Sequence, residues 1–417
     1  MARGEAEVVI IGGGAAGIAA ARRLHEAGID ALIIEARERL GGRAWTAEAG
    51  GFAVDLGCGW LHSAERNPWT KIAQAQGRTI ETSLPPWMRP GAQIGVSAAE
   101  ASAFRNALFR LHERVEAMPA DEPDKPVSAF LEAGGRWNGL LDAVSTYYSG
   151  GELDRVSARD LATYEDDGVN WRVVEGYGRV IADHAAGLPV AFACKAKRID
   201  RRGPRLRVET NQGPITADAV VVTVSSALIA EQPELFLPAL PEKTEAAAGL
   251  PLGLADKLYL TLADAESFDS DSRAFGATNR AATAAYQFRP FGRPIVEVYF
   301  GGALAAELET GGEPAFFDFA RAELVGLFGA DFARRIAPLH HHGWLLDPFA
   351  RGSYSYASPG KVGCRAALAA PVDGRLFFAG EACSQSDFST AHGAYLTGVA
   401  AADQAIAALR PGRRHTA

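Results

Sequence analysis

Hydrophobic positions near the start of the chain follow a strand, helix, strand pattern. Residues 8–11 are a run of apolar, β-branched residues, which is typical of a strand buried in a parallel sheet. Apolar residues then recur with helical spacing over residues 15–27, and Gly28 stands where a helix often has its C-terminal glycine. Residues 31–34 form a second apolar run. The pattern therefore predicts one β-α-β unit.

Beyond this unit the pattern changes several times. Residues 76–164 mix polar and apolar positions in a way typical of helices, with proline breaks between them. A small antiparallel meander is expected from short alternating segments at residues 189–192, 197–200, 205–210 and 215–217. A further buried parallel strand is expected at residues 219–224. Later elements are expected as strands at 257–262, 295–300 and 376–379 and as helices at 315–328 and 389–409.

These elements predict an α/β fold with two domains that share an interface. A chain of 417 residues is too long for one simple core, and its 48% of hydrophobic residues can fill two. We expect a Rossmann-like FAD-binding domain and a discontinuous second domain of α+β type. The first would comprise residues 1–75, 171–225 and 370–417, and the second, substrate-binding domain residues 76–170 and 226–369.

The turn between the first strand and the first helix carries the motif Gly12-x-Gly14-x-x-Gly17. Gly12 would make the tight turn, Gly14 would let the backbone approach a pyrophosphate, and Gly17 would let the helix pack against the strand. Glu35 ends the second strand, where a carboxylate can accept both ribose hydroxyls and repels the 2′-phosphate of NADP. The motif by itself predicts FAD or NAD.

Charge and cysteine content narrow the class of protein. The formal net charge is -8, and no basic block exceeds the pairs Arg201-Arg202 and Arg413-Arg414, so nucleic acid is not an expected partner. The four cysteines show no Cys-x-x-Cys spacing, which favours reduced thiols and a cytoplasmic location over a zinc site or a disulfide framework. We expect no signal peptide and no membrane helix.

Residues 35–43 extend the nucleotide motif with two glycines and several arginines. Ala36 and Arg37 follow Glu35, and Gly42 and Arg43 come shortly after. Arg43 is a candidate contact for an anionic part of a cofactor. Together with the glycine motif, the run Glu-Ala-Arg-x-Arg-Leu-Gly-Gly-Arg resembles the flavin-containing amine oxidase family, which includes monoamine and polyamine oxidases. The resemblance implies FAD as the cofactor.

A second segment with the same resemblance lies near the C-terminus. Phe378-Ala379-Gly380-Glu381, followed by His392-Gly393-Ala394, is similar to the last motif of the family, whose Gly-Glu pair contacts the ribityl-phosphate part of FAD. A helix N-terminus there would stabilise negative charge on a reduced flavin. The resemblance implies FAD contacts from Gly12, Gly14, Ala15, Ala16, Gly17, Glu35, Ala36, Arg37, Gly42, Arg43, Gly59, Trp60, Leu61, Ala196, Gly380, Glu381 and Ala391.

Candidate catalytic residues follow from three further matches to the family. Lys257 lies in a Gly-x-x-x-Lys segment, whose lysine in the family holds a water near flavin N5 and assists reoxidation by oxygen. A lysine at the start of an apolar strand is otherwise costly to bury. Trp344 and Tyr354 lie in a segment similar to the family's Trp, Asp-Pro and Gly-x-Tyr region, and Tyr354 would form one wall of a substrate cage. Thr390 occupies the place of the second cage tyrosine, and Trp344 would be the third residue of the cage.

Two comparisons inside the family refine the expected chemistry. Ser353 stands where monoamine oxidases carry the cysteine bonded to flavin, so the FAD should be bound without a covalent link. His62 ends an Asp-Leu-Gly-x-x-Trp-x-His segment and would line the amine entrance, as in polyamine oxidases. L-amino acid oxidases show Met-Arg here, and the missing arginine argues against an α-carboxylate on the substrate.

Two clusters leave a structural alternative open. Residues 165–167, Glu-Asp-Asp, could attract a second ammonium group of a diamine or could form a solvated loop. Residues 340–342 are three histidines, but neighbouring side chains on a strand point in different directions, and no carboxylate or cysteine set accompanies them. No metal is expected.

The resemblance implies oxidation of a primary or secondary amine to an imine, which hydrolyses to an aldehyde, while O2 is reduced to H2O2. The expected partners are a small-molecule amine and O2, with no nucleic acid and no membrane, and a homodimer is the candidate assembly. Alternatives are a flavin amine dehydrogenase that uses a protein electron acceptor, an enzyme similar to L-amino acid oxidases, and an FAD-binding scaffold without activity.

Overall fold

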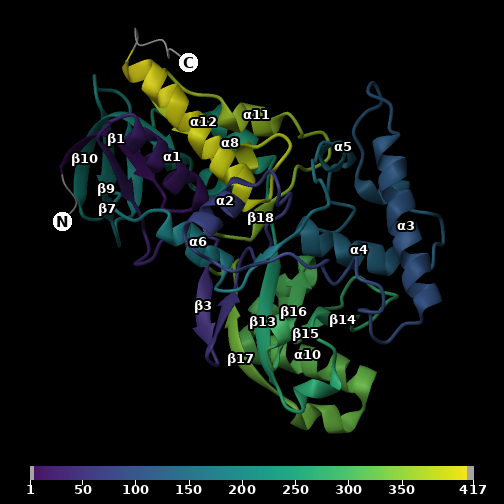
Figure 1. Cartoon of the computed structure of the whole chain (residues 1–417). Coiled ribbons are helices and arrows are strands. Elements are labelled where there is room, and N and C mark those ends of the chain that lie inside the picture. The colour runs from purple at the N-terminus through teal and green to yellow at the C-terminus, as the bar shows by residue number, and fades with distance from the viewer. Residues whose placement is uncertain (1–3, 411–417) are drawn as a thin grey trace.

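The structure is a computed structural model that describes residues 4–410. A large mixed sheet lies at the left of Figure 1. The strand order is β11 (Phe236–Leu237), β8 (Ala196–Asp200), β9 (Leu206–Thr210), β10 (Gly213–Val222), β1 (Glu5–Ile11), β2 (Ala31–Ile34) and β7 (Val190–Ala191), with β19 (Leu376–Phe378) also paired to β10. The predicted β-α-β unit is present as β1, α1 (Ala15–Glu26) and β2, and Gly28 follows the helix with a φ of +67°.

Side chains of β1 alternate between the two faces of this sheet, and each face has its own hydrophobic core. Val8 and Ile10 pack beneath α1, α2 (Pro68–Ala75), α6 (Tyr177–Asp183) and α12 (Ala391–Leu409). Val9 and Ile11 belong to the opposite core, which is covered by α7 (Ser226–Glu231), α8 (Pro241–Ala248) and α11 (Cys364–Ala369). Burial on both faces explains the continuous apolar run that the sequence shows.

The strand β10 corrects one prediction. Residues 215–217 and 219–224 were expected as separate strands, but Gly213–Val222 is continuous. Its first half pairs antiparallel with β9, and its second half pairs parallel with β19. Asp218, which suggested a break, is partly buried and forms an ion pair with Arg205 at 2.7 Å. The predicted meander is therefore part of the large sheet. Strand β7, which was expected in the meander, instead pairs in parallel with β2 at the edge of the same sheet.

A second, antiparallel sheet lies at the bottom of Figure 1. Its strand order is β14 (Ser272–Phe275), β15 (Ala285–Phe288), β16 (Ile295–Gly301), β13 (Ala255–Leu262) and β17 (Ile336–His342). One face packs against α9 (Gly302–Glu309) and α10 (Gly312–Phe328) around a core that includes Leu258, Val298 and Phe316. The opposite face carries polar and aromatic side chains, which line the site described below.

Residues 76–164, which were expected to be helical, contain the helices of a layer seen at the right of Figure 1. It contains α3 (Ala98–Glu116), α4 (Asn138–Tyr148) and α5 (Ala158–Ala162). The remaining strands form three small pairs, β3 (Thr46–Ala49) with β4 (Phe52–Asp55), β5 (Ile80–Glu81) with β6 (Arg172–Val173), and β12 (Leu252–Gly253) with β18 (Tyr354–Ser355). The domain boundaries stay a prediction. Residues 226–248, placed in the second domain, pack on the large sheet through α7 and α8.

Candidate active site

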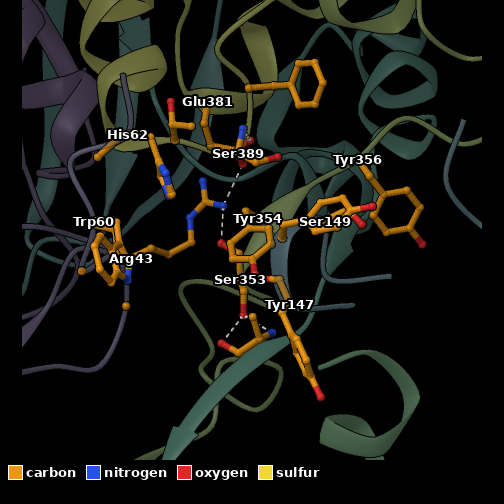
Figure 2. A pocket seen from close by; sticks show the side chains of 18 of the residues that line it. Arg43, Trp60, His62, Tyr147, Ser149, Ser353, Tyr354, Tyr356, Glu381 and Ser389 are labelled. Atoms are coloured by element: carbon orange, nitrogen blue, oxygen red, sulfur yellow. Dashed lines mark hydrogen bonds and ion pairs between the residues drawn. The ribbon is translucent and has the colours of Figure 1, made fainter. Parts of the chain in front are cut away.

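A cavity of about 1070 Å³ connects the three layers. It begins at the turn between β1 and α1, passes over the polar face of the small sheet, and ends between α3 and α4. In the view of Figure 2, His62, Trp60 and Arg43 lie on one side, and Tyr147 and Tyr356 lie on the other. Residues far apart in the sequence therefore enclose one continuous space.

The glycine motif shapes the nucleotide end of this cavity. Gly12 has a φ of +110°, a conformation that only glycine adopts readily. A Cβ on Gly17 would lie 1.9 Å from the Gly12 carbonyl oxygen, whereas a Cβ on Gly14 would meet no atom closer than 3.8 Å. Gly14 is also the N-cap of α1 and has no side chain to cap it. The first N–H groups of α1 are thus available to an anion such as a pyrophosphate.

Glu35 lies at the end of β2, as predicted, and is buried. One carboxylate oxygen accepts a hydrogen bond from the Gly13 N–H at 2.7 Å, and the other accepts from the Arg37 N–H at 2.8 Å. Arg37 itself is paired with Asp347 at 2.5 Å. Each carboxylate oxygen can accept a second bond. The side chain is therefore fixed in place while retaining acceptor capacity for ribose hydroxyls.

Arg43 and Glu381 form an ion pair where the two cofactor motifs meet. Arg43 Nη1 lies 2.8 Å from Glu381 Oε1 and also donates to the Ser353 carbonyl at 2.8 Å. Glu381 further accepts from the Ser355 hydroxyl at 2.6 Å. Burial raises the pKa of Glu381, but Arg43 and Ser355 outweigh it and hold the pKa below its ordinary value. A charged carboxylate is thus maintained beside the cavity.

Lys257 projects from β13 and is almost completely buried. Its ammonium donates to the Asp55 carbonyl at 2.9 Å and lies 3.0 Å from Glu297 Oε1 on β16. Burial alone would lower the pKa of Lys257, but Glu297 and the neighbouring Tyr259 and Tyr299 raise it well above its ordinary value. The group is therefore a fixed positive charge in the cavity wall. Two of its three donors are used, which leaves one for a water molecule or a reactant.

Tyr354, the predicted cage residue, stands among aromatic side chains. Its hydroxyl donates to the Tyr147 carbonyl and lies 3.3 Å from the Tyr299 hydroxyl. Burial and the nearby Tyr299 raise the pKa of Tyr354 well above its ordinary value, so the phenol is neutral. Ser353, which precedes it, exchanges hydrogen bonds with the N–H and carbonyl of Ala255 at 2.9 and 3.1 Å. These bonds lock the backbone on which Tyr354 sits.

His62 lines the cavity beside Asn170. The distance between His62 Nδ1 and Asn170 Oδ1 is 2.6 Å. The Asn170 amide nitrogen donates to the Gly168 carbonyl at 3.0 Å, so its oxygen accepts from a protonated Nδ1. Burial lowers the pKa of His62 despite this bond. The ring is therefore neutral near pH 7, with Nε2 as a hydrogen-bond acceptor.

Thr390 and Trp344 also reach the cavity, but each makes structural bonds. Thr390 is the N-cap of α12, where its hydroxyl accepts from the Gly393 N–H at 2.9 Å and donates to the Asp387 carbonyl at 2.6 Å. Trp344 is 1% exposed, and its indole donates to the Leu56 carbonyl at 3.1 Å. The Thr390 side chain thus stabilises the start of α12, and the Trp344 side chain holds the segment after β4. Their roles in a substrate cage stay predictions.

The structure brings most predicted site residues to one place. All five candidate catalytic residues line the cavity, as do all candidate FAD contacts except Gly17 and Leu61. Gly17 packs against Gly12, and Leu61 is fully buried with its backbone bonded to Trp171. Asp166 is the member of the Glu-Asp-Asp run that lines the cavity, and it is an exposed residue.

Sequence reasoning missed the cavity residues that carry no motif. They include Phe104, Tyr147, Asn170, Arg273, Gln287, Glu297 and Tyr299. The sequence does contain a signal for Glu297, because it is a charged residue inside the apolar run 295–300. His340, His341 and His342 lie on β17 outside the cavity, and no cluster of three or more metal-ligating side chains occurs within residues 4–410. None of the helices in that range is long and apolar enough to cross a membrane.

A family model described as flavin-containing amine oxidoreductase matches residues 15–143 and 96–406 of the chain. The chain belongs to this family. Polyamine oxidase 2 of Arabidopsis thaliana is 30% identical over 442 residues, covering 95% of this chain and 87% of the relative. Polyamine oxidase 3 of Oryza sativa subsp. japonica is 29% identical over 431 residues, covering 95% and 88%.

The fold also has a solved counterpart. A double mutant of putrescine oxidase, from a structure-based redesign of cofactor binding, superposes with a TM-score of 0.77 at 16% identity and covers 97% of this chain and 99% of that one. The predicted α/β, two-domain fold class is thereby confirmed. Membership of the family confirms a flavin-dependent oxidoreductase of the amine oxidase type that acts on amines.

Proposed function

We propose that this chain binds FAD without a covalent link and oxidises a primary or secondary amine to an imine, with O2 as the electron acceptor and H2O2 as the second product. The imine then hydrolyses to an aldehyde. The observation that carries the proposal is the buried Lys257 ammonium, which Asp55 and Glu297 hold in the wall of a cavity that also contains the nucleotide motif. When bound, the flavin supplies the two-electron oxidation of the amine.

The residues of the cavity fit FAD. The open face of Gly14 at the uncapped N-terminus of α1 suits a pyrophosphate, and Glu35 suits the ribose of an adenosine. Arg43 extends from the same region toward Glu381 at the other motif. Ser353 supports non-covalent binding, because a hydroxyl cannot form the thioether that a cysteine could.

The other cavity residues prepare the amine. Tyr354, Tyr299 and Tyr147 provide aromatic surface that excludes water and favours the neutral amine over the ammonium ion. His62 Nε2 can accept a hydrogen bond from the amine N–H, and the bond from Nδ1 to Asn170 fixes the ring in the tautomer that this requires. The chain thus binds and orients the amine without a charged base.

Lys257 supports oxygen as the acceptor. A permanent ammonium, held by hydrogen bonds before the reaction starts, stabilises negative charge that develops on oxygen as it takes up electrons. A protein electron acceptor would not require such a charge inside the cavity. Lys257 therefore supports the oxidase proposal over the dehydrogenase alternative.

Anaerobic mixing of the holoenzyme with a panel of amines and amino acids tests the proposal. Amines should bleach the flavin absorbance, and admission of air should restore it rapidly with stoichiometric H2O2. Reduction by amines with slow recovery in air would contradict the oxidase assignment in favour of a dehydrogenase. Bleaching by α-amino acids alone would contradict the amine assignment, and no bleaching by any compound would indicate a scaffold.

A second experiment tests how the flavin is bound. Acid precipitation should release all of the flavin, and yellow protein in the pellet would contradict non-covalent binding.

A further inference from the structure

Arg273 lies on β14 and lines the cavity. No ion pair or side-chain hydrogen bond joins its guanidinium to any residue between 4 and 410, and the guanidinium carbon lies 4.7 Å from the centre of the Phe275 ring. Burial lowers the pKa of Arg273 to about 10, so the group is charged at neutral pH. A cavity built for an amine therefore contains a cation without a counter-ion.

The other partly buried arginines that line the cavity have partners for their side chains, and Arg89 donates to the Ser270 and Asp271 carbonyls at 2.7 Å each. Arg43 pairs with Glu381, and Arg37 pairs with Asp347. The carboxylate of Asp271, two residues before Arg273, is bonded to Arg172 at 2.8 Å and to the Gln287 amide at 2.7 Å. Partly buried charges are normally paired, because desolvation without a partner is unfavourable. Within residues 4–410 the Arg273 guanidinium has neither a carboxylate nor a carbonyl partner, whereas the buried Lys243, which also lacks a carboxylate, donates to three backbone carbonyls.

Strand register places Arg273 far from Lys257 along the same face. Lys257 is opposite Tyr299, Tyr299 is opposite Ala285, and Ala285 is opposite Phe275, so β14 lies three strand spacings from β13. This separation is about 14 Å across the sheet, and Arg273 is two further residues along β14. Side chains two residues apart in a strand share a face. Arg273 and Lys257 therefore stand at opposite ends of one wall.

The space between them is lined by aromatic rings. Tyr147 stacks on Phe275 with ring centroids 6.4 Å apart, and Tyr147 and Tyr299 meet edge to face at 5.9 Å. Tyr354, labelled with Tyr147 in Figure 2, adds its ring and bonds the Tyr147 backbone. An extended apolar chain fits along this surface. Its two ends would meet Lys257 with His62 at one end and Arg273 at the other.

We propose that the substrate is an amine whose opposite end carries a carboxylate, and that Arg273 binds this carboxylate. The planar guanidinium matches a carboxylate with two parallel hydrogen bonds, and the bound substrate supplies the counter-ion that the protein lacks. An α-carboxylate would lie beside the reacting carbon, too far from Arg273, so the class is ω-amino carboxylates instead of α-amino acids. The inference rests on the proposed amine oxidation at the same site.

The test compares steady-state kcat/KM of the holoenzyme for ω-aminooctanoate, octylamine and ω-aminooctanamide, which differ only at the far end. The wild type should prefer the carboxylate by about 100-fold over both neutral compounds, the range expected for a buried charge pair. In Arg273→Met the preference should disappear through a higher KM for the carboxylate, while kcat/KM for octylamine should stay the same or rise. The shorter ω-aminobutanoate should show a smaller preference, because it cannot span the wall.

Arg105 on α3 provides a matched control. It also lines the cavity, but it is exposed to solvent. Arg105→Met removes the same charge and should leave the preference within about threefold of the wild-type value, because exposed charges are well screened. An equal loss of preference in Arg105→Met would overturn the proposal in favour of a general positive field.

Stability provides a readout that does not depend on turnover. Since Arg273 has no partner, Arg273→Met should fold and should not lower Tm, whereas a structural arginine would lose stability. Equal kcat/KM for the three octyl compounds in the wild type would overturn the inference while leaving amine oxidation intact. Failure of all three compounds and of every other amine to reduce the flavin would instead contradict the proposed function itself.

Discussion

At the scale of single residues, Lys257 is the side chain whose replacement distinguishes the two halves of the proposed reaction. Its ammonium is fixed by Asp55 and Glu297, so it is in position before any substrate binds. Lys257→Met should slow reoxidation of the reduced enzyme by O2 by about 100-fold or more, the usual effect of losing one preorganised donor. Stopped-flow mixing of the reduced enzyme with oxygen measures this rate.

The anaerobic reduction of Lys257→Met by amine serves as the internal control. It should change by less than about threefold, because the amine is held by His62 and the aromatic wall. Lys257→Arg, which keeps the charge, should retain part of the oxygen reactivity. An unchanged rate with oxygen in Lys257→Met would show that the buried ammonium has no part in reoxidation.

Glu297 sets the protonation of Lys257, which gives a prediction on pH. Burial lowers the pKa of Lys257, and Glu297 raises it, so removing the carboxylate in Glu297→Gln should let the pKa fall. The ammonium is present below its pKa and lost above it. The rate of reoxidation should therefore be flat to about pH 10 in the wild type and should decline with rising pH at a lower value in Glu297→Gln. Stopped-flow rates measured across pH check this, and identical profiles would contradict the assignment.

At the scale of elements, the junction of β1 and α1 contains one glycine that is needed for folding and another that is needed for cofactor binding. A methyl group on Gly17 would overlap the Gly12 carbonyl, whereas a methyl group on Gly14 has room in the protein but occupies the space that a pyrophosphate needs. Gly17→Ala should lower Tm of the flavin-free protein by several degrees. Gly14→Ala should leave that Tm unchanged and weaken FAD binding by at least about tenfold. Thermal unfolding and flavin titration check both, and equal effects of the two changes would contradict this division.

At the start of helix α12, two substitutions of Thr390 can distinguish its role in helix capping from its predicted role in the substrate cage. Its hydroxyl caps the helix, so Thr390→Val should destabilise the protein by about 1 kcal/mol, while Thr390→Ser keeps the cap and should change the free energy of unfolding little. Denaturant unfolding measures both. If Thr390 is also a small wall of the substrate cage, Thr390→Ser should shift KM among amines of different bulk without a change in stability. Equal stability of the two variants would contradict the capping role.

The elements that sequence could predict are those with a local signal. Apolar runs and glycine spacing predict β1, α1 and β2, and the family motifs predict Lys257, Tyr354 and Glu381 in one place. A meander segment at 215–217 and a separate buried strand at 219–224 were expected in place of β10, because Asp218 interrupts the apolar run and its partner Arg205 is not visible in the pattern. Phe104, Tyr147 and Arg273 were missed for another reason. They reach the cavity only through the packing of α3, α4 and β14, and no local pattern encodes that packing.

At the scale of the whole molecule, the cavity is bounded by both sheets and by the helical layer. A ligand that fills it stabilises all three together, since it binds the folded state alone. Removal of the flavin should lower Tm by about 5 °C or more, and added FAD should restore it. FMN, which has no adenosine for Glu35 and the glycine motif, should restore less. Differential scanning calorimetry of the holo, apo and reconstituted proteins measures these shifts, and an unchanged Tm would contradict a cofactor shared among the layers.

The contact between α1 and α12 has a consequence for how the protein is made. A Cβ on Gly398 of α12 would lie 2.2 Å from the Ala16 carbonyl oxygen of α1, so the two helices touch at their backbones. On a ribosome, the interval between these residues takes about 20–80 s at typical elongation rates. The nascent β-α-β unit therefore keeps one apolar face of α1 uncovered until the residues around Gly398 have been made. Chaperones have that whole interval in which to bind the uncovered face of α1.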